Sequence, residues 1–290
     1  MNSVNGWKIV APVFLLLAML ACTPAFAQSP GIDFSGEWTN QVLDGEADAR
    51  DQETGNILNI PYNAAGRQAA EVMNLSLLGL PEWQCRPHPG QFSWRGTGQN
   101  RITKVVDVVT RETTAFRVER RRNIDMLVYL DGRPHPPEDA AHLWTGFSTG
   151  KWIGNMLEIH TTHLKDGYFG MHGGASSDKA TIMERWIRHG DYLFVYQTIT
   201  DPIYLEEPYV TSQVFRLDLE GRLPPSPCIP IQETPLERGQ VPAFLPGQNP
   251  YWYDFVDLYN IPRQVLKDGA EKMYPEYQAK LKVYRASKSN

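Results

Sequence analysis

The sequence predicts a mainly β fold, an antiparallel meander that closes into a barrel, with one N-terminal helix and a C-terminal helical tail. From Arg101 to Asp218, short runs rich in β-branched and aromatic residues are separated by turn signals about every ten residues. Helical crossovers, which parallel strands would need, are missing between these runs. Runs such as 192–196 (YLFVY) are apolar on both sides, so the meander must either stack on a second sheet or close around an interior. Closure is preferred because it leaves no exposed edge.

The elements follow in order. An opening strand is expected at 33–39 around Gly36 and Trp38, and one surface helix at 61–75. Prolines and tryptophans make 79–98 an ordered loop. His189-Gly190-Asp191 marks a tight hairpin, and Gly154-Asn155 marks another. The remaining strands are expected at 101–109, 112–119, 123–130, 155–163, 180–188, 191–200 and 209–218.

The first 27 residues have the pattern of a signal peptide. Lys8 precedes an apolar run over 9–21, and Ala25-Phe26-Ala27 gives a small-residue cleavage site. The run is too short for a membrane span. The alternative is a lipoprotein whose first residue is a lipidated Cys22. Both alternatives place the mature chain in the periplasm or outside the cell.

The barrel domain is expected over 28–222 and a Pro- and aromatic-rich extension over 223–290. The extension holds the aromatic cluster 251–255 and, after Pro262, apolar residues at helical spacing. It is too short for a separate domain. We expect it to dock on the barrel as a plug, a lid or the surface of a homodimer.

Charge and cysteine content narrow the function classes. The formal net charge is −5, and the one basic cluster, Arg120-Arg121-Arg122, is typical of a solvated strand end, so a nucleic-acid partner is not expected. Two cysteines, Cys85 and Cys228, remain after leader removal. In an oxidising compartment they predict one disulfide, with a thiolate nucleophile as the alternative.

The segment 129–137 (YLDGRPHPP) carries the most chemistry in the fewest residues. Gly132 and the prolines cannot continue a strand, so Asp131, Arg133 and His135 should lie at the rim of the sheet, beside Tyr129. The structural alternative is a hairpin turn in which Asp131 accepts backbone N–H groups and pairs with Arg133.

Strand 155–163 is expected to separate an ionisable face from an apolar one. Glu158, His160 and Thr162 share a face, opposite Leu157 and Ile159. The ionisable face points inward if the barrel interior is partly polar and toward solvent otherwise. A metal site from His160 and His163 would need a bulge near Thr162 and a third ligand from His135 or His172, so no metal is predicted.

Two further elements could supply acid–base groups. Glu184 shares a face with Ile182 and Trp186, where apolar neighbours favour the protonated acid; a structural pair with an arginine is the alternative. The glycine-rich loop 168–178 is expected to be mobile, with His172 able to move protons near neutral pH. No phosphate-binding, dinucleotide or haem motif occurs, so no cofactor is predicted.

The segments DGRPHP (131–136), GFSTGKWIGNML (146–157) and Glu184-Arg185-Trp186 resemble a large set of uncharacterised exported bacterial proteins. That set reads DGRPHP, G-x-S-x-G-x-W-x-G-x-x-L, an acidic residue followed by threonines, and E-R-aromatic. The match covers roughly Ser35 to Asp218. The resemblance implies an exported, lipocalin-like barrel and no particular reaction. Relatives carry Asp or Glu at the position of His160, and a His-Pro-His-Ser-like segment at 172–177, so substrate or pH dependence would differ here.

Three hypotheses follow. The first is a periplasmic, lipocalin-like barrel that encloses a small, mainly apolar or amphipathic molecule, whose orientation would be fixed by the polar groups of Asp131, Arg133, His135, His160 and Glu184. The second is a cofactor-independent lyase, isomerase or hydrolase on the same scaffold, which requires an imidazole hydrogen-bonded to a carboxylate. The third is an envelope interaction protein that uses 251–255 and the tail. The candidate catalytic residues are His160, His135, Asp131, Glu184 and Arg133, and the candidate ligand contacts are Glu158, Trp152, His172 and Tyr129.

Overall fold

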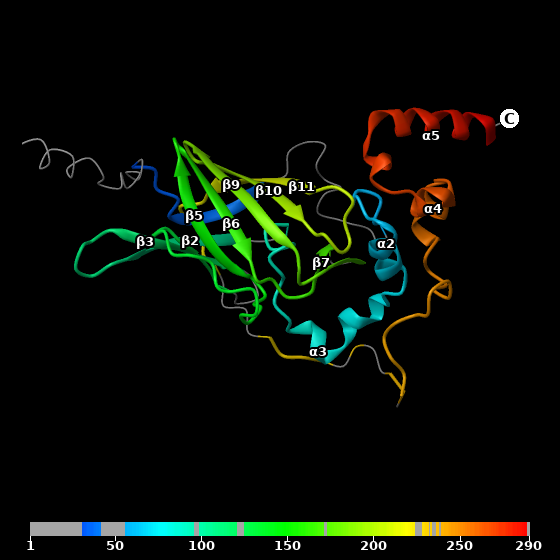
Figure 1. Cartoon of the computed structure of the whole chain (residues 1–290), viewed down its shortest axis with the longest axis horizontal. Coiled ribbons are helices and arrows are strands. Elements are labelled where there is room, and N and C mark those ends of the chain that lie inside the picture. The colour runs from blue at the N-terminus through cyan, green and yellow to red at the C-terminus, as the bar shows by residue number, and fades with distance from the viewer. Residues whose placement is uncertain are drawn as a thin grey trace, which may run out of the picture. The chain divides into compact units, whose positions relative to one another are not determined.

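The computed structural model of the protein contains a closed β-barrel (Figure 1). The structure describes residues 31–41, 56–95, 99–120, 125–170, 173–223, 228–231, 233, 236–237 and 239–288. The predicted signal peptide, Cys22 and His172 lie outside these residues. The described chain from Ile32 onward is one compact unit. The predicted fold class, a mainly β barrel with a C-terminal helix, is confirmed.

Nine strands make the barrel, in the order β1-β11-β10-β9-β6-β5-β4-β3-β2. Their bounds are β1 Gly36–Gln41, β2 Gln99–Val106, β3 Thr113–Arg120, β4 Met126–Tyr129, β5 Phe147–Ile153, β6 Met156–Thr162, β9 Thr181–His189, β10 Tyr192–Thr200 and β11 Tyr209–Leu217. A separate hairpin pairs β7 (Gly167–Gly170) with β8 (Gly173–Ser176), within the segment expected to be a mobile loop. The tight turn at Gly190 (φ +58°) joins β9 to β10 as expected.

One strand pair differs from the predicted meander. β4 and β5 are parallel, with Val128 opposite Ser148 and Tyr129 opposite Thr149. The long irregular segment 130–146 connects the end of β4 to the start of β5, so these parallel strands are joined without a helical crossover. This segment contains the DGRPHP motif, which therefore lies on a connection between two parallel strands and not in a hairpin turn.

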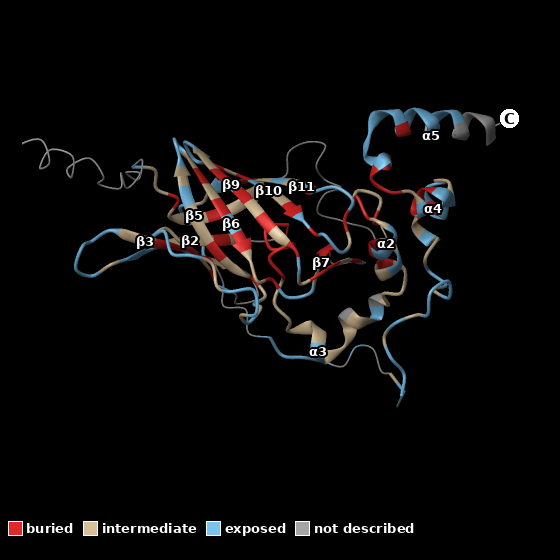
Figure 2. Cartoon of the chain, in the orientation of Figure 1, coloured by how far each residue is buried: buried red, intermediate tan, exposed pale blue. Residues whose placement is uncertain are grey.

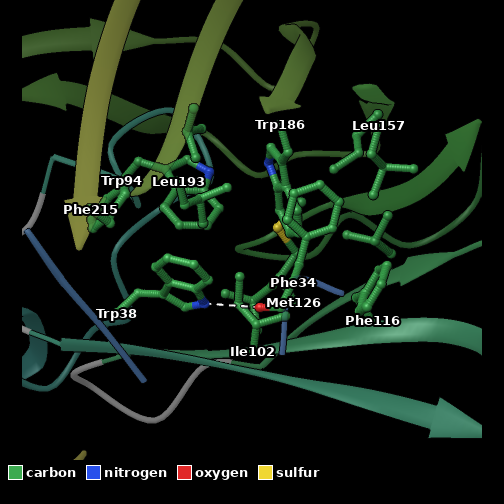
Figure 3. Close-up of a cluster of buried hydrophobic side chains, with 14 residues drawn as sticks. Phe34, Trp38, Trp94, Ile102, Phe116, Met126, Leu157, Trp186, Leu193 and Phe215 are labelled. Carbon is green, nitrogen blue, oxygen red and sulfur yellow. Dashed lines mark hydrogen bonds between the residues drawn. The ribbon is translucent and has the colours of Figure 1, made fainter. Parts of the chain in front are cut away.

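Alternation of buried and exposed residues along the strands gives the barrel a buried interior (Figure 2). In β10, Leu193, Val195 and Ile199 are buried, whereas Tyr192 and Tyr196 are 43% and 42% exposed. The run 192–196 is thus apolar on both sides without being buried on both sides. Figure 3 shows the resulting core of fourteen buried side chains, in which the rings of Phe34, Trp38, Trp94, Phe116, Trp186 and Phe215 gather between the strands.

A segment from outside the sheet fills part of this interior. Residues 89–95, in the loop after α3 (Pro81–Gln84), are all buried. The carbonyl of Gly90 accepts a hydrogen bond from Gln197 Nε2 (3.1 Å), and Trp94 packs in the core 5.4 Å from Trp186. We call residues 89–95 the plug segment. The sequence indicated an ordered loop here but not that it enters the barrel.

A second apolar cluster lies between the barrel, helix α2 (Ala64–Glu71) and the C-terminal extension. Ile182 and Ile199 of the barrel pack there with Ala70 of α2 and with Val256 and Leu266 of the extension. The extension comprises α4 (Asp254–Leu258), the 3₁₀ helices η2 (Arg263–Lys267) and η3 (Ala270–Met273), and α5 (Pro275–Lys288), whereas η1 (Leu75–Gly79) follows α2. The predicted helix at 61–75 is present but shorter.

The predicted disulfide is present in the structure. Cys85 and Cys228 are bonded, with their Cα atoms 5.6 Å apart. Beside the bridge, Ile231 N donates to Gln84 Oε1 (2.6 Å), so the chain at Ile231 is held against the end of α3. None of the helices in the described part of the chain is long and apolar enough to span a membrane.

Candidate functional site

The DGRPHP segment lies against the outer face of the barrel. Gly132 (φ +72°) turns the chain after β4, and the Asp131 carboxylate accepts hydrogen bonds from Arg133 Nε (2.9 Å) and Nη2 (2.5 Å). The Arg133 guanidinium stacks on the Tyr129 ring at 3.7 Å, and Tyr129 stacks on Phe147 at 5.2 Å. Arg133 holds the pKa of Asp131 below its usual range. The pair therefore stays ionised and fixes the start of the segment.

His135 is at the centre of this face. Its Nε2 is 2.8 Å from Thr149 Oγ1 of β5, and its Nδ1 is 2.7 Å from Thr162 Oγ1 of β6. The ring also meets the edge of Phe147, with centroids 5.3 Å apart. Burial, with His160 and His163 nearby, lowers the pKa of His135. A neutral imidazole at pH 7 follows.

His160 completes the group from β6. It alternates with the buried Ile159, so its exposed side chain faces outward. Its ring lies 5.0 Å from that of His135, and its direct cross-strand neighbours are Thr149 and Met183. We refer to Tyr129, Asp131, Arg133, His135, Phe147, Thr149, His160 and Thr162 as the outer-face cluster.

The hydrogen bonds around His135 have one direction when the imidazoles are neutral. His163 Nε2 is 2.8 Å from the Pro137 carbonyl, which can only accept, so Nε2 carries the proton and Nδ1 accepts. Thr162 Oγ1, 2.7 Å from His163 Nδ1, must therefore donate its single proton there. His135 Nδ1–H then donates to Thr162, and His135 Nε2 accepts from the Thr149 hydroxyl. The lone pair of His135 Nε2 thus faces Thr149.

Glu184 lies apart from this cluster, inside the barrel, where it is 1% exposed. Its oxygens accept hydrogen bonds from Trp94 Nε1 (2.9 Å), Trp186 Nε1 (2.8 Å) and Gln197 Nε2 (3.2 Å). Burial raises the pKa of Glu184, although Arg120 and these donors oppose the rise. The site residues predicted from sequence therefore do not share one cavity.

Arg120 is the buried counter-charge of Glu184. Its guanidinium stacks on the Trp94 ring at 4.0 Å, and burial lowers its pKa to about 10. Arg120 was expected at a solvated strand end; instead it is 8% exposed because Trp94 of the plug segment covers it. Trp94 thus contacts two opposite charges, because it stacks on the Arg120 guanidinium and donates a hydrogen bond to the Glu184 carboxylate.

The other predicted ligand contacts are dispersed. Glu158 faces outward and accepts a hydrogen bond from Arg185 Nε (3.1 Å). Trp152 packs inward, stacked on Phe34 at 5.7 Å. Among the predicted ligand contacts that the structure describes, Tyr129 alone belongs to the outer-face cluster. No group of three or more His, Cys, Asp or Glu side chains that could hold a metal occurs among the residues that the structure describes.

A surface pocket lies elsewhere and contains none of the predicted site residues. Its volume is about 470 Å³. One of its carboxylates, Asp218, is already bound by Thr39 Oγ1 (3.0 Å) and Gln99 Nε2 (3.2 Å). The lining residues are Thr39, Gln41, Asp191, Arg216, Leu217, Asp218, Leu219 and Glu220.

Sequence reasoning missed the hydroxyl groups and the third imidazole of the outer-face network. Thr149 occurs in the G-x-S-x-G segment, and its register opposite His160 could have been found by pairing the strands at the Gly154 turn. His163 has φ +56°, which carries its ring back toward Thr162 instead of to the opposite face. No sequence signal marks that turn.

Comparison with known protein families and with curated proteins does not assign this chain to a family. No protein-family model matches the chain, and no curated protein matches it.

Proposed function

We propose that this chain is an exported, periplasmic β-barrel that binds a small amphipathic molecule at the outer-face cluster. One observation carries the proposal: four of the five polar residues selected from the sequence meet on this face, although they come from a loop and from β6. The ring centroids of His135 and His160 are 5.0 Å apart, and the Arg133 guanidinium lies 3.7 Å from the centroid of the Tyr129 ring, so these side chains are close neighbours. A ligand here would find charge, imidazole and aromatic surface together.

The barrel interior supports the same location for the ligand. A closed barrel with buried polar residues is consistent with ligand binding, but the fourteen core side chains and the plug segment fill the space between the strands. Its buried carboxylate, Glu184, already accepts three hydrogen bonds. We therefore place the ligand outside the sheet, against Tyr129 and Phe147. The disulfide supports an oxidising compartment, and the motif resemblance supports export.

The two alternatives have less support. The acid–base enzyme requires an imidazole hydrogen-bonded to a carboxylate, but the ring nitrogens of His135 bond to the hydroxyls of Thr149 and Thr162. For the interaction protein, exposed rings at 251–255 are needed. Tyr251 is 63% exposed, whereas Trp252, Tyr253 and Phe255 pack against the second apolar cluster. Most of that aromatic cluster stabilises the fold.

Native mass spectrometry on protein purified from its own host tests the proposal. Wild type should carry a small bound mass, and His160→Ala should lose it with an almost unchanged melting temperature, because His160 is exposed. His189→Ala is the matched control, since His189 is an exposed histidine at the far end of β9. Absence of any bound mass in wild type, or its retention in His160→Ala, would reject the site.

A further inference from the structure

In the outer-face cluster, the hydroxyl of Thr149 lies within hydrogen-bond distance of the His135 imidazole, which is the arrangement of a nucleophile and its general base. We propose that Thr149, His135 and His160 cleave small esters by acyl transfer through Thr149; this goes beyond ligand binding and rests on the proposed ligand site. Nucleophile and base are recognised by a hydrogen bond between them and by a third group that orients the base. Thr149 Oγ1 and His135 Nε2 are 2.8 Å apart, and Thr162 orients His135 through Nδ1 at 2.7 Å.

The direction of the hydrogen-bond chain makes His135 a base toward Thr149. In the neutral tautomers, in which His163 Nε2–H donates to the Pro137 carbonyl, each following donor is fixed, and the Nε2 lone pair of His135 accepts the hydrogen bond from the Thr149 hydroxyl. When His135 takes that proton, its Nδ1–H still donates to Thr162, so the imidazolium keeps its partner. Thr162 and His163 act here as positioning residues in the place that a carboxylate usually has.

The reacting groups can be reached from solvent. Thr149 and His135 are partly exposed, and His160 is exposed. Thr149 and His160 are directly opposed across β5 and β6, so their side chains project from the same face about 5 Å apart at Cβ. An N–H of His160 can therefore approach a carbonyl oxygen whose carbon is at Thr149. Tyr129 and Phe147, which stack on one another, offer an apolar surface for the acyl or alcohol part.

The step balances within these groups and water. Thr149 Oγ1 bonds to the ester carbonyl carbon while its proton moves to His135 Nε2, and the oxyanion accepts a hydrogen bond from His160. The carbon–oxygen bond to the alcohol breaks with its electron pair, and His135 returns the proton to the leaving oxygen. Water then attacks the acyl-threonine with His135 as base, releasing the carboxylic acid and restoring Thr149.

The test uses p-nitrophenyl acetate and the full-length protein as purified. After an acid quench, peptide mass mapping should find one acetyl group on Thr149. Thr149→Val keeps the shape of the side chain without its hydroxyl and should abolish the adduct and lower p-nitrophenol release at least about tenfold. Thr149→Ser should retain both. Thr103→Val, an outward-facing threonine on β2, is the matched control and should change neither.

Variants at two more positions distinguish the general base, His135, from the positioning residue, Thr162. His135→Gln should lose the adduct as Thr149→Val does. Thr162→Val should slow release, and Thr162→Ser, which restores the hydroxyl, should recover it; a merely structural role would not depend on the hydroxyl. Acetyl groups confined to lysines or histidines, or equal release by wild type and Thr149→Val, would overturn the inference. Retention of a bound small molecule by such material would leave the binding proposal intact.

Discussion

Trp94 Nε1 donates a 2.9 Å hydrogen bond to Glu184 Oε1, which joins the plug segment to β9 inside the barrel. The same indole carries the Arg120 guanidinium on its face. A single buried carboxylate therefore binds a segment that comes from outside the sheet and also balances the charge of Arg120, which that segment covers. The stability of the filled barrel should depend on this carboxylate more than on any exposed ion pair.

Glu184→Leu should reduce the free energy of unfolding by about 3–5 kcal/mol, because it leaves three buried N–H groups without an acceptor and the buried Arg120 guanidinium without its counter-charge. Glu184→Gln should cost about 1–3 kcal/mol. Glutamine avoids the burial cost that raises the pKa of Glu184, but its NH₂ would then face a donor, since Trp94, Trp186 and Gln197 all donate to the carboxylate.

Urea unfolding measures both losses. Glu158→Gln is the control, because Glu158 bonds Arg185 on the outer surface, where an ion pair contributes less than about 1 kcal/mol. If Glu184→Gln unfolds at the same urea concentration as wild type, Glu184 does not hold the plug segment.

Local sequence patterns predicted the barrel well. Alternation in 155–163 grouped Glu158, His160 and Thr162 on one face, and turn residues located the hairpin at Gly190. These features depend on neighbours along the chain or across one turn. The orientation of β5 does not depend on such neighbours. Its parallel pairing with β4 is set by the path of the long connecting segment 130–146.

The candidate site was predicted only in part for the same reason. His135 and His160 were selected for their chemistry, but Thr149, Thr162 and His163 enter the site through pairing between strands and a left-handed turn. Glu184 was correctly expected among apolar neighbours. The plug segment that binds it gives no periodic signal, since none of its residues is in a strand or a helix.

Gly150 of the G-x-S-x-G segment should not tolerate a side chain. A Cβ there would lie 2.8 Å from Leu130 and 3.0 Å from Val128, inside the packed barrel wall. Gly150→Ala should therefore lower the free energy of unfolding by about 1–3 kcal/mol, although its backbone conformation suits alanine. Thermal unfolding compared with Lys151→Ala, at an exposed neighbouring position, checks this. A Gly150→Ala melting temperature equal to that of Lys151→Ala would contradict the crowding.

The disulfide should stabilise the fold by closing a long loop. Cys85 and Cys228 are separated by 143 residues, and a bridge of such span contributes about 2–4 kcal/mol. The double variant Cys85→Ala/Cys228→Ala should unfold at lower urea concentration. It should also expose the chain near Ile231 to protease, because the hydrogen bond from Ile231 to Gln84 is then no longer supported by the neighbouring disulfide. Mass mapping without reductant should recover the Cys85–Cys228 peptide pair from wild type. Two free thiols in periplasmically produced protein would contradict it.

Lys272 on η3 should make stability rise with pH above neutrality. It is 4% exposed, and its Nζ has no hydrogen-bond partner among the described residues. Burial, helped by Arg67, lowers its pKa from 10.5 to about 8. The folded protein thus binds this proton less tightly than the unfolded chain. Between about pH 8 and 10.5 the unfolded state holds more protons, so this residue's contribution to the free energy of unfolding increases with pH.

Lys272→Met keeps the apolar length of the side chain and removes the buried charge. At pH 7 it should therefore stabilise the protein, by on the order of 2 kcal/mol once relaxation around the ammonium is allowed for. Above pH 10.5 the lysine is neutral in both states, so the difference between the two proteins should shrink toward zero. Urea unfolding of both proteins from pH 7 to 10.5 measures this difference in the free energy of unfolding. Because both proteins have the same tyrosines, the effect of tyrosine titration cancels in the difference. A variant less stable than wild type at pH 7 would mean that the ammonium is bound by a partner in solution.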